Sequence, residues 1–154
     1  MRYNRRIKTK AQKRRKQRIH IGIKGKKSAK VTEEYTAEHL LSGLLPVFAT
    51  PSLVALMEYT CSDSVQGELD EGFGTVGSCI ECNHLSPSPI GSTITCESEL
   101  IEVDKRRLVF RVRAFDDFGE IGSGIHERFI IDNEKFMLKV NEKKRMLESE
   151  SGAK

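Results

Sequence analysis

Hydrophobic and polar residues alternate along several segments in the second half of the chain. One face of one segment carries Ile94, Cys96, Ser98 and Leu100, and one face of the next carries Leu108, Phe110, Val112 and Ala114. A period of two is typical of strands that bury one face. Four such segments follow one another: "FGTVGSCIECNHL", "STITCESELIEV", "LVFRVRAF" and "EIGSGIHERFII". Because short turns separate them, the pattern favours an antiparallel meander, and a further strand is expected earlier in the chain.

One long helix is predicted from Thr50 to about Gly67. Thr50 is in position to act as its N-cap, and Pro51 occupies the first helical position, where its missing N–H costs nothing. The helix is apolar nearly all round, with a main stripe of Leu53, Leu56, Met57, Thr60 and Cys61 that Val54, Ala55 and Val65 extend. A helix of this kind must be covered on most sides, which one curved antiparallel sheet wrapped around it would achieve. The fold class is therefore predicted to be α+β.

The charge distribution divides the chain into three parts. Residues 1–30 hold 14 of the 26 Lys and Arg residues and no acid. Residues 1–20 are predicted to be a basic, disordered leader, which could bind polyanions non-specifically. Residues 21–136 should form the folded domain, and residues 137–154 a short helix or a polar tail. No apolar run is long enough for a membrane span or a secretory signal, so a cytoplasmic location is expected.

The four cysteines are expected to be reduced thiols, as is usual in a cytosol. Cys79 and Cys82 have the spacing of a zinc or redox motif. They fall in a predicted strand, however, where residues three apart point to opposite faces, and no second Cys or His pair follows at ligand spacing. We therefore expect no metal site and no redox chemistry at this pair.

Glu58 is the one charged residue between Leu40 and Ser62. An unpaired carboxylate in such apolar surroundings needs a partner, or solvent in a cleft, because burying the charge alone costs several kcal/mol. The alternative is a partly exposed glutamate at the margin of the helix, since Glu is a good helix former at any position.

His84 is the second candidate for chemistry. It shares a strand face with Val76, Ser78, Ile80 and Cys82, so its ring should point inward, either as a satisfied core histidine or as a partner of Thr50 and Glu58. The eight residues from Thr50 to Glu58 rise about 12 Å along a helix, and the Glu side chain leans back by about 3–4 Å. One imidazole bonded at both nitrogens can bridge the rest. A Thr50–His84–Glu58 relay is thus feasible, although an offset of roughly 80° around the axis requires an irregular first turn.

Four segments of the chain resemble a known family. The segments "PVFATPSLVALME", "VGSCIECNHLSPSPIGSTIT", "RRLVFRVRAFD" and "IGSGIHERFIID" are similar to those of hotdog-fold acyl-CoA thioesterases, in the branch typified by fluoroacetyl-CoA thioesterase. The resemblance covers about residues 21–136. It implies a hotdog fold, a long helix wrapped by an antiparallel sheet, and a homodimer with its active sites near the subunit interface. It also implies hydrolysis of an acyl-CoA with no further cofactor, coenzyme A being part of the substrate.

The resemblance also implies roles for particular residues. The family's catalytic threonine, glutamate and histidine fall on Thr50, Glu58 and His84, and the arginine of its "HERF" block falls on Arg128. His84 would transfer the proton, Glu58 would orient His84 or act as the base, and Thr50 would be the nucleophile or would position water. At the positive end of the helix, the Thr50 position could also stabilise an oxyanion.

Substrate contacts are expected at two further places. Leu41, Leu44 and Leu45 stand where the fluoroacetyl-CoA-specific enzyme has an aromatic lid, so a short or medium acyl group is expected instead of fluoroacetyl. Gly122 and Gly124 share a strand face with Arg128, which could meet an anionic acyl group or a CoA phosphate or form a surface ion pair. These glycines would let a ligand or neighbouring backbone approach closely.

Two other functions are compatible with the sequence. The first is a hotdog module that binds acyl-CoA without turnover. The second is a nucleic-acid-associated protein that uses the basic leader. The acidic balance of the folded part and its lack of an aromatic-rich basic sheet argue against the second.

Overall fold

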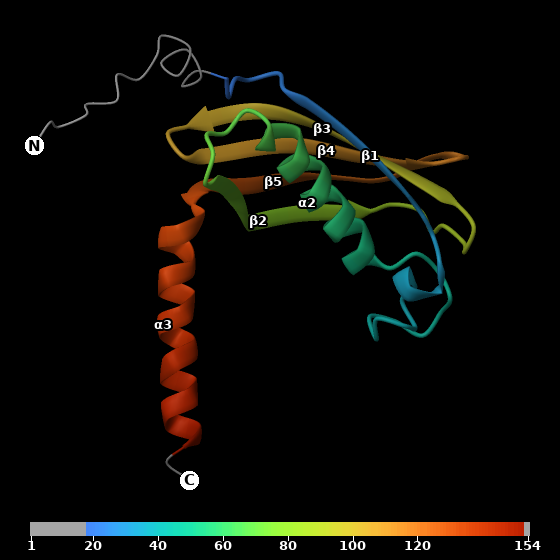
Figure 1. Ribbon diagram of the computed structural model, residues 1–154. Coiled ribbons are helices and arrows are strands. Elements are labelled where there is room, and N and C mark those ends of the chain that lie inside the picture. The colour runs from blue at the N-terminus through green and yellow to red at the C-terminus, as the bar shows by residue number, and fades with distance from the viewer. Residues whose placement is uncertain (1–17, 153–154) are drawn as a thin grey trace, which may run out of the picture.

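The computed structural model describes residues 18–152, which form one curved sheet and a helix lying across it (Figure 1). The strands are β1 (Lys24–Lys30), β2 (Phe73–His84), β3 (Thr93–Asp104), β4 (Arg107–Asp116) and β5 (Gly119–Asp132). The helices are α2 (Thr50–Gln66) and α3 (Asn133–Ser151), with a 3-10 turn, η2, at Glu33–Tyr35. The predicted α+β class is confirmed. The basic leader lies almost entirely outside the described residues.

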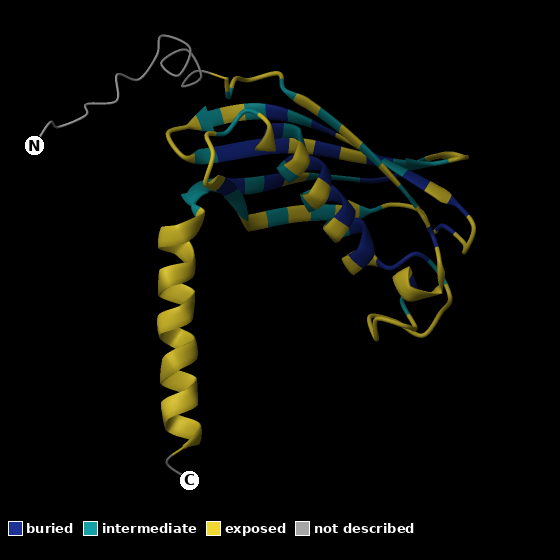
Figure 2. Ribbon diagram, viewed as in Figure 1, coloured by how far each residue is buried: buried dark blue, intermediate teal, exposed yellow. Residues whose placement is uncertain are grey.

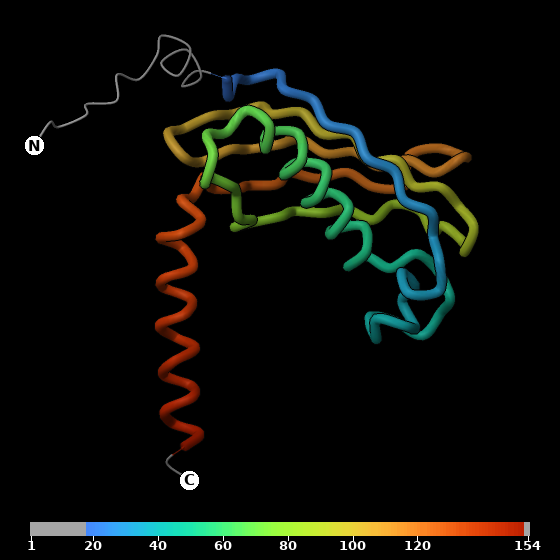
Figure 3. Tube along the Cα trace, viewed as in Figure 1, coloured from blue at the N-terminus to red at the C-terminus, as the bar shows by residue number. Residues whose placement is uncertain are grey.

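The order of the strands differs from the predicted meander. All pairs are antiparallel, but the order is β1-β3-β4-β5-β2, so β2 lies beside β5 at one edge instead of beside β3. The segment after β2 does not fold back as a hairpin, because it pairs with the chain before α2. The Phe48 N–H donates to the Ser88 carbonyl at 2.9 Å, and Val47 bridges to Pro89. The segment therefore crosses from β2, at one edge of the sheet, to β3, which lies next to β1 at the opposite edge (Figure 3).

The core lies between α2 and one face of the sheet (Figure 2). The predicted apolar stripe of α2 is buried, and the alternating residues of β3 and β4 face it: Ile94, Cys96, Leu100, Leu108, Phe110, Val112 and Ala114 are all fully buried. Residues 18–152 leave the other side of α2 uncovered. Ala55 and Tyr59 are exposed there, so the described part of one chain does not meet the expectation of cover on most sides.

Gly25 lets β1 approach α2 closely. A Cβ atom at this position would lie 2.6 Å from the Ser98 Oγ and 2.8 Å from the Thr60 carbonyl oxygen. Real Cβ atoms do not approach other atoms so closely, so an added methyl group would force the strand and helix apart.

We expect Gly25→Ala to lower the free energy of unfolding by about 1–3 kcal/mol, as overpacking does. Gly67→Ala is the matched control. It lies at the end of α2 with φ −68° and no atom within 4 Å of the added Cβ, so it should stay within about 0.5 kcal/mol of the parent. Urea unfolding of both variants measures this. Equal midpoints would contradict the close packing of β1 on α2.

The C-terminal helix α3 is longer than the short helix or tail predicted for residues 137–154. Asp132 caps it, its Oδ1 accepting a hydrogen bond from the Lys135 N–H at 3.0 Å. The helix runs away from the sheet, and none of its residues is buried (Figures 1 and 2). Within residues 18–152, no helix combines the length and hydrophobicity that crossing a bilayer would require.

Candidate active site

Thr50 is the first residue of α2, and its hydroxyl faces the end of β2. The N-cap is Ala49, which is extended, and Thr50 makes no capping hydrogen bond. The predicted capping role is therefore wrong, because the helix begins one residue before the position that Pro51 had suggested. The Thr50 Oγ1 lies instead 2.9 Å from the His84 Nδ1, within hydrogen-bonding distance.

His84 is the last residue of β2 and points inward, as predicted. Its ring packs edge-on against Phe48, with ring centroids 6.3 Å apart. Burial lowers the pKa of His84 below the ordinary value of 6.5, so the ring is neutral at pH 7. Its Nε2 is buried and has no hydrogen-bond partner among the described residues.

A cavity of about 320 Å³ opens beside this pair. Its walls are Thr50, His84 and three segments: the loop around Ala37 and Ser42, residues 47–49, and residues 85–87. The hydroxyl and the imidazole thus face a space that can admit a small acyl group.

Glu58 lies two turns further along α2 and does not contact His84 within one chain. Its Oε1 is 3.6 Å from the His126 Nε2 and 3.9 Å from the Arg128 Nη1. The offset of roughly 80° between Thr50 and Glu58 around the helix axis explains this, because a regular helix turns Glu58 toward the middle of β2 and β5. The irregular first turn that the relay required is not observed, since α2 begins at Thr50 and the Leu53 N–H donates to the Ala49 carbonyl at 3.0 Å, as in a regular helix. The structure therefore brings Thr50 and His84 together and leaves Glu58 with a different set of partners.

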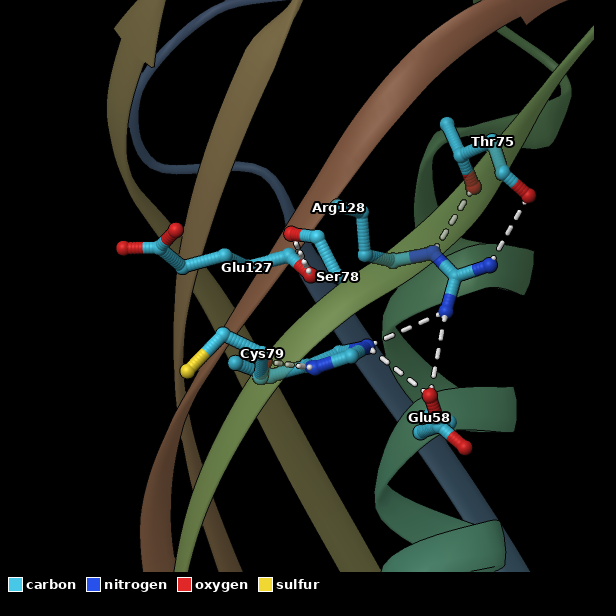
Figure 4. Close-up of polar contacts among 7 residues, drawn as sticks. Glu58, Thr75, Ser78, Cys79, Glu127 and Arg128 are labelled. Carbon is cyan, nitrogen blue, oxygen red and sulfur yellow. Dashed lines mark hydrogen bonds and ion pairs between the residues drawn. The ribbon is translucent and has the colours of Figure 1, made fainter.

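Arg128 is almost fully buried on β5, so it is not a surface ion pair. Its guanidinium donates from Nε to the Thr75 Oγ1 at 2.8 Å and from Nη2 to the Thr75 carbonyl at 2.9 Å, and Nη1 faces Glu58 (Figure 4). Burial lowers the pKa of Arg128, and the Glu58 carboxylate opposes that shift. Arginine stays charged in proteins, so Arg128 presents a fixed cation to Glu58.

A β-bulge shapes the strand that faces this cation. The pairing of β2 with β5 shifts between Gly77 and Cys79, so Ser78 is the extra residue. The bulge reverses the faces of the preceding residues. Thr75 and Gly77 face the helix there, instead of Val76 and Ser78 as the alternation had predicted.

Gly77 makes room for the Glu58 carboxylate. A Cβ atom at Gly77 would overlap the Glu58 Oε1 and would lie 3.2 Å from the His126 Cε1. An opening of about 400 Å³ lies over Glu58, Tyr59, Gly77 and Arg128. The carboxylate is accordingly half-exposed, with 42% of its side chain accessible.

The other predicted contact residues lie apart from Arg128. Leu44 and Leu45 are exposed on the loop before α2, at 92% and 64%. Gly122 pairs with His84 and packs against the helix, where an added Cβ would lie 2.8 Å from the Leu53 Cδ2. Gly124 lies directly against the backbone of Glu81. Both glycines thus allow close approach of neighbouring protein atoms, and substrate contacts at them stay a prediction.

Cys79 is exposed and Cys82 is half-buried, so the two thiols point to opposite faces of β2, as predicted.

Sequence reasoning missed two residues that contact the Arg128 guanidinium, His126 and Thr75. The signal for His126 was its place on the same strand face as Arg128. No local pattern marked the bulge that turns Thr75 inward.

Comparison with known proteins identifies close relatives of this chain. A family model described as fluoroacetyl-CoA-specific thioesterase matches residues 31–134. The curated fluoroacetyl-CoA thioesterase of Streptantibioticus cattleyicolor is 45% identical over 97 residues, which are 63% of this chain and 70% of that protein. A solved structure of the fluoroacetyl-CoA thioesterase superposes with a TM-score of 0.77 at 37% identity, covering 81% of this chain and 97% of that one.

A more distant solved structure has a similar fold. A Thermus thermophilus protein described as a thioesterase superfamily member superposes with a TM-score of 0.80 at 27% identity, covering 86% of this chain and 98% of that one.

Proposed function

Because this chain belongs to the fluoroacetyl-CoA-specific thioesterase family, with the hotdog fold of acyl-CoA thioesterases, we propose that it hydrolyses short or medium acyl-CoA thioesters through Thr50, His84 and Glu58. The observation that carries the assignment is the 2.9 Å contact between the Thr50 Oγ1 and the His84 Nδ1 beside the 320 Å³ cavity. The products are a carboxylate and free CoA.

The proposed chemistry begins at the contact between Thr50 and His84. A neutral His84 can accept a proton at Nδ1 from the Thr50 hydroxyl, or from a water molecule that Thr50 positions, as the nucleophile attacks the thioester carbonyl. The lowered pKa of His84 keeps it in the neutral form that this step needs at pH 7. The departing CoA thiolate then takes up the proton from His84. Where Thr50 itself is the nucleophile, a water molecule that gives its proton to His84 then attacks the acyl–Thr50 ester, which releases the carboxylate and restores the hydroxyl.

The proposed role of Glu58 requires a second copy of the chain. If Nδ1 accepts from Thr50, the other ring nitrogen, Nε2, carries the hydrogen, and residues 18–152 of the same chain offer it no acceptor. A carboxylate there would stabilise the imidazolium that forms during the reaction. We assign that carboxylate to Glu58 of the second copy.

The sheet offers an edge at which the second copy could pair. On the side away from β5, β2 has no neighbouring strand in residues 18–152. Two β2 strands related by a two-fold axis near Ile80 would bring the Gly77 end of one beside the His84 end of the other. Since Glu58 lies against Gly77, this arrangement would place it close to the second copy's His84. The same dimer would cover part of the exposed side of α2.

The proposed substrate range follows from the loop before α2. This loop contributes Ala37 and Ser42 to the cavity wall, and it carries the exposed Leu41, Leu44 and Leu45. These leucines, in place of an aromatic lid, are proposed to contact an aliphatic chain at the mouth of the cavity. Arg128 is proposed to hold the Glu58 carboxylate in its orientation. A second proposed role is direct contact with an anionic acyl group.

Release of free thiol from a panel of acyl-CoAs tests this function. We expect turnover of short and medium acyl-CoAs, with little preference for fluoroacetyl-CoA. The competing function is an acyl-CoA-binding module without turnover. Binding of CoA ligands by calorimetry, together with no thiol release from any member of the panel, would establish that alternative and refute the hydrolase.

A further inference from the structure

His126 is buried beside the Arg128–Glu58 pair, with 1% of its side chain exposed. The Nδ1 of its ring lies 2.8 Å from the Cys79 carbonyl on β2, and Nε2 lies 3.0 Å from the Arg128 Nη1. The mechanism proposed above gives His126 no role. Its contacts nevertheless connect β2, the buried cation and the carboxylate of α2.

The two hydrogen bonds determine the protonation state of the ring. A carbonyl oxygen can only accept, so the Nδ1 that faces Cys79 must carry a hydrogen. A guanidinium can only donate, so the Nε2 that faces Arg128 must present a lone pair. Both contacts are satisfied together only by the neutral ring with its hydrogen on Nδ1.

We propose that His126 is a positioning residue: as the neutral Nδ1–H tautomer, it holds the Arg128 guanidinium so that Nη1 faces the Glu58 carboxylate. Thr75 supplies the other two fixed contacts of the guanidinium, so His126 is the third. This inference rests on the proposed function, because the orientation of Glu58 matters only if Glu58 acts in the reaction.

Protonation of His126 would break this arrangement. The ring is faced by Arg128 from β5, by Glu58 from α2 and by the Cys79 carbonyl from β2, with Glu127 as the adjacent charge on β5. An imidazolium would turn an N–H donor and a positive charge toward Arg128, and its nearest acceptor would be the Glu58 Oε1 at 3.6 Å. The carboxylate would then pair with His126 in place of Arg128. Desolvation and the charge of Arg128 lower the pKa of His126, which favours the neutral ring at pH 7.

Two matched variants separate the two hydrogen bonds of the ring. His126→Asn places an amide near Nδ1 and can still donate to Cys79, but it has no acceptor for Arg128. His126→Gln places an amide oxygen near Nε2 and can still accept from Arg128. We expect the Asn variant to lose about tenfold to a hundredfold in kcat with a smaller change in KM, on the scale of a buried hydrogen bond to a charged group. The Gln variant should keep most of the parent's turnover.

The pH profile gives a readout that a merely structural residue would not move. In the parent, activity should fall on the acid side as His84 and His126 are protonated, and in the Gln variant only the contribution of His84 should remain. Melting temperatures measured in parallel show how much each variant is destabilised. Equal activities of the Asn and Gln variants, or activities that follow the folded fraction, would overturn the proposal.

Nitrogen-15 NMR of the imidazole in the parent protein tests the tautomer without any measurement of activity. A protonated Nδ1 and an unprotonated Nε2 at pH 7 are expected for His126. An Nε2–H tautomer or an imidazolium at that pH would overturn the proposal even if all variants fail to fold. If the parent hydrolyses no acyl-CoA while NMR finds the expected tautomer, the proposed function fails and the contacts of His126 stand.

Discussion

Replacing His84 with alanine is expected to lower kcat by about 10²–10⁴-fold, the range for loss of a general acid–base group. The reason is the contact between the His84 Nδ1 and the Thr50 hydroxyl, which no other described side chain can replace. His84 is the residue whose loss should reduce turnover most. The measurement is steady-state thiol release with a substrate that the parent turns over well.

Two comparisons make the His84→Ala result specific. His20→Ala removes an exposed histidine far along the chain from the site, and it should leave kcat unchanged. Thr50→Val and Thr50→Ser test the partner of His84: the valine variant should be impaired, and the serine variant, which keeps a hydroxyl, should retain more turnover. Stable His84→Ala protein with the parent's kcat would refute the catalytic role of the pair.

Glu58→Gln is expected to lower kcat by about 10²-fold while the protein stays folded. The substitution keeps the size and helix propensity of the side chain but removes the negative charge that would stabilise an imidazolium at His84. The free energy of unfolding should change little, since the carboxylate is 42% exposed and its closest contact with Arg128 is 3.9 Å. Glu71→Gln, at an exposed position after α2, is the matched control and should be neutral.

A mixing experiment then tests whether the site is shared between two copies. His84→Ala and Glu58→Gln chains are each nearly inactive alone. If Glu58 of one copy serves His84 of the other, a mixed dimer has one intact site, and co-expression should restore roughly a quarter of the parent's activity. No recovery in verified mixed dimers would place both residues of a working site in the same chain, and the dimer arrangement proposed above would be wrong.

Local patterns in the sequence correctly predicted α2 and the strands β2, β3, β4 and β5. The period of two in β3 and β4 identified the buried faces, because each side chain's direction depends only on its place in the pleat. The stripe of α2 was predicted for the same reason. The four quoted segments also led to the correct family and fold.

Two features were less predictable from local patterns: the length of the C-terminal helix and the role of Thr50. Propensity along a polar segment such as residues 133–151 is a weak signal, and the capping contact of Asp132 decides where α3 begins. At the other helix, Thr50 had the right residue type for a cap. Its hydroxyl nevertheless faces His84, a residue 34 positions later in the chain.

By itself, then, the sequence determined the helix α2, the strands, the buried faces of β3 and β4, the family, and which residue types were available for catalysis. Tertiary structure decided the position of β2 at the sheet edge, the bulge at Ser78 and the partners of Glu58. The physical reason is the distance along the chain over which each interaction acts. Side-chain periodicity acts over a few residues, whereas strand pairing and ion pairs depend on segments that meet only after the chain folds. The 80° turn of the helix directs Glu58 to Arg128, and the bulge with Gly77 makes the space for its carboxylate.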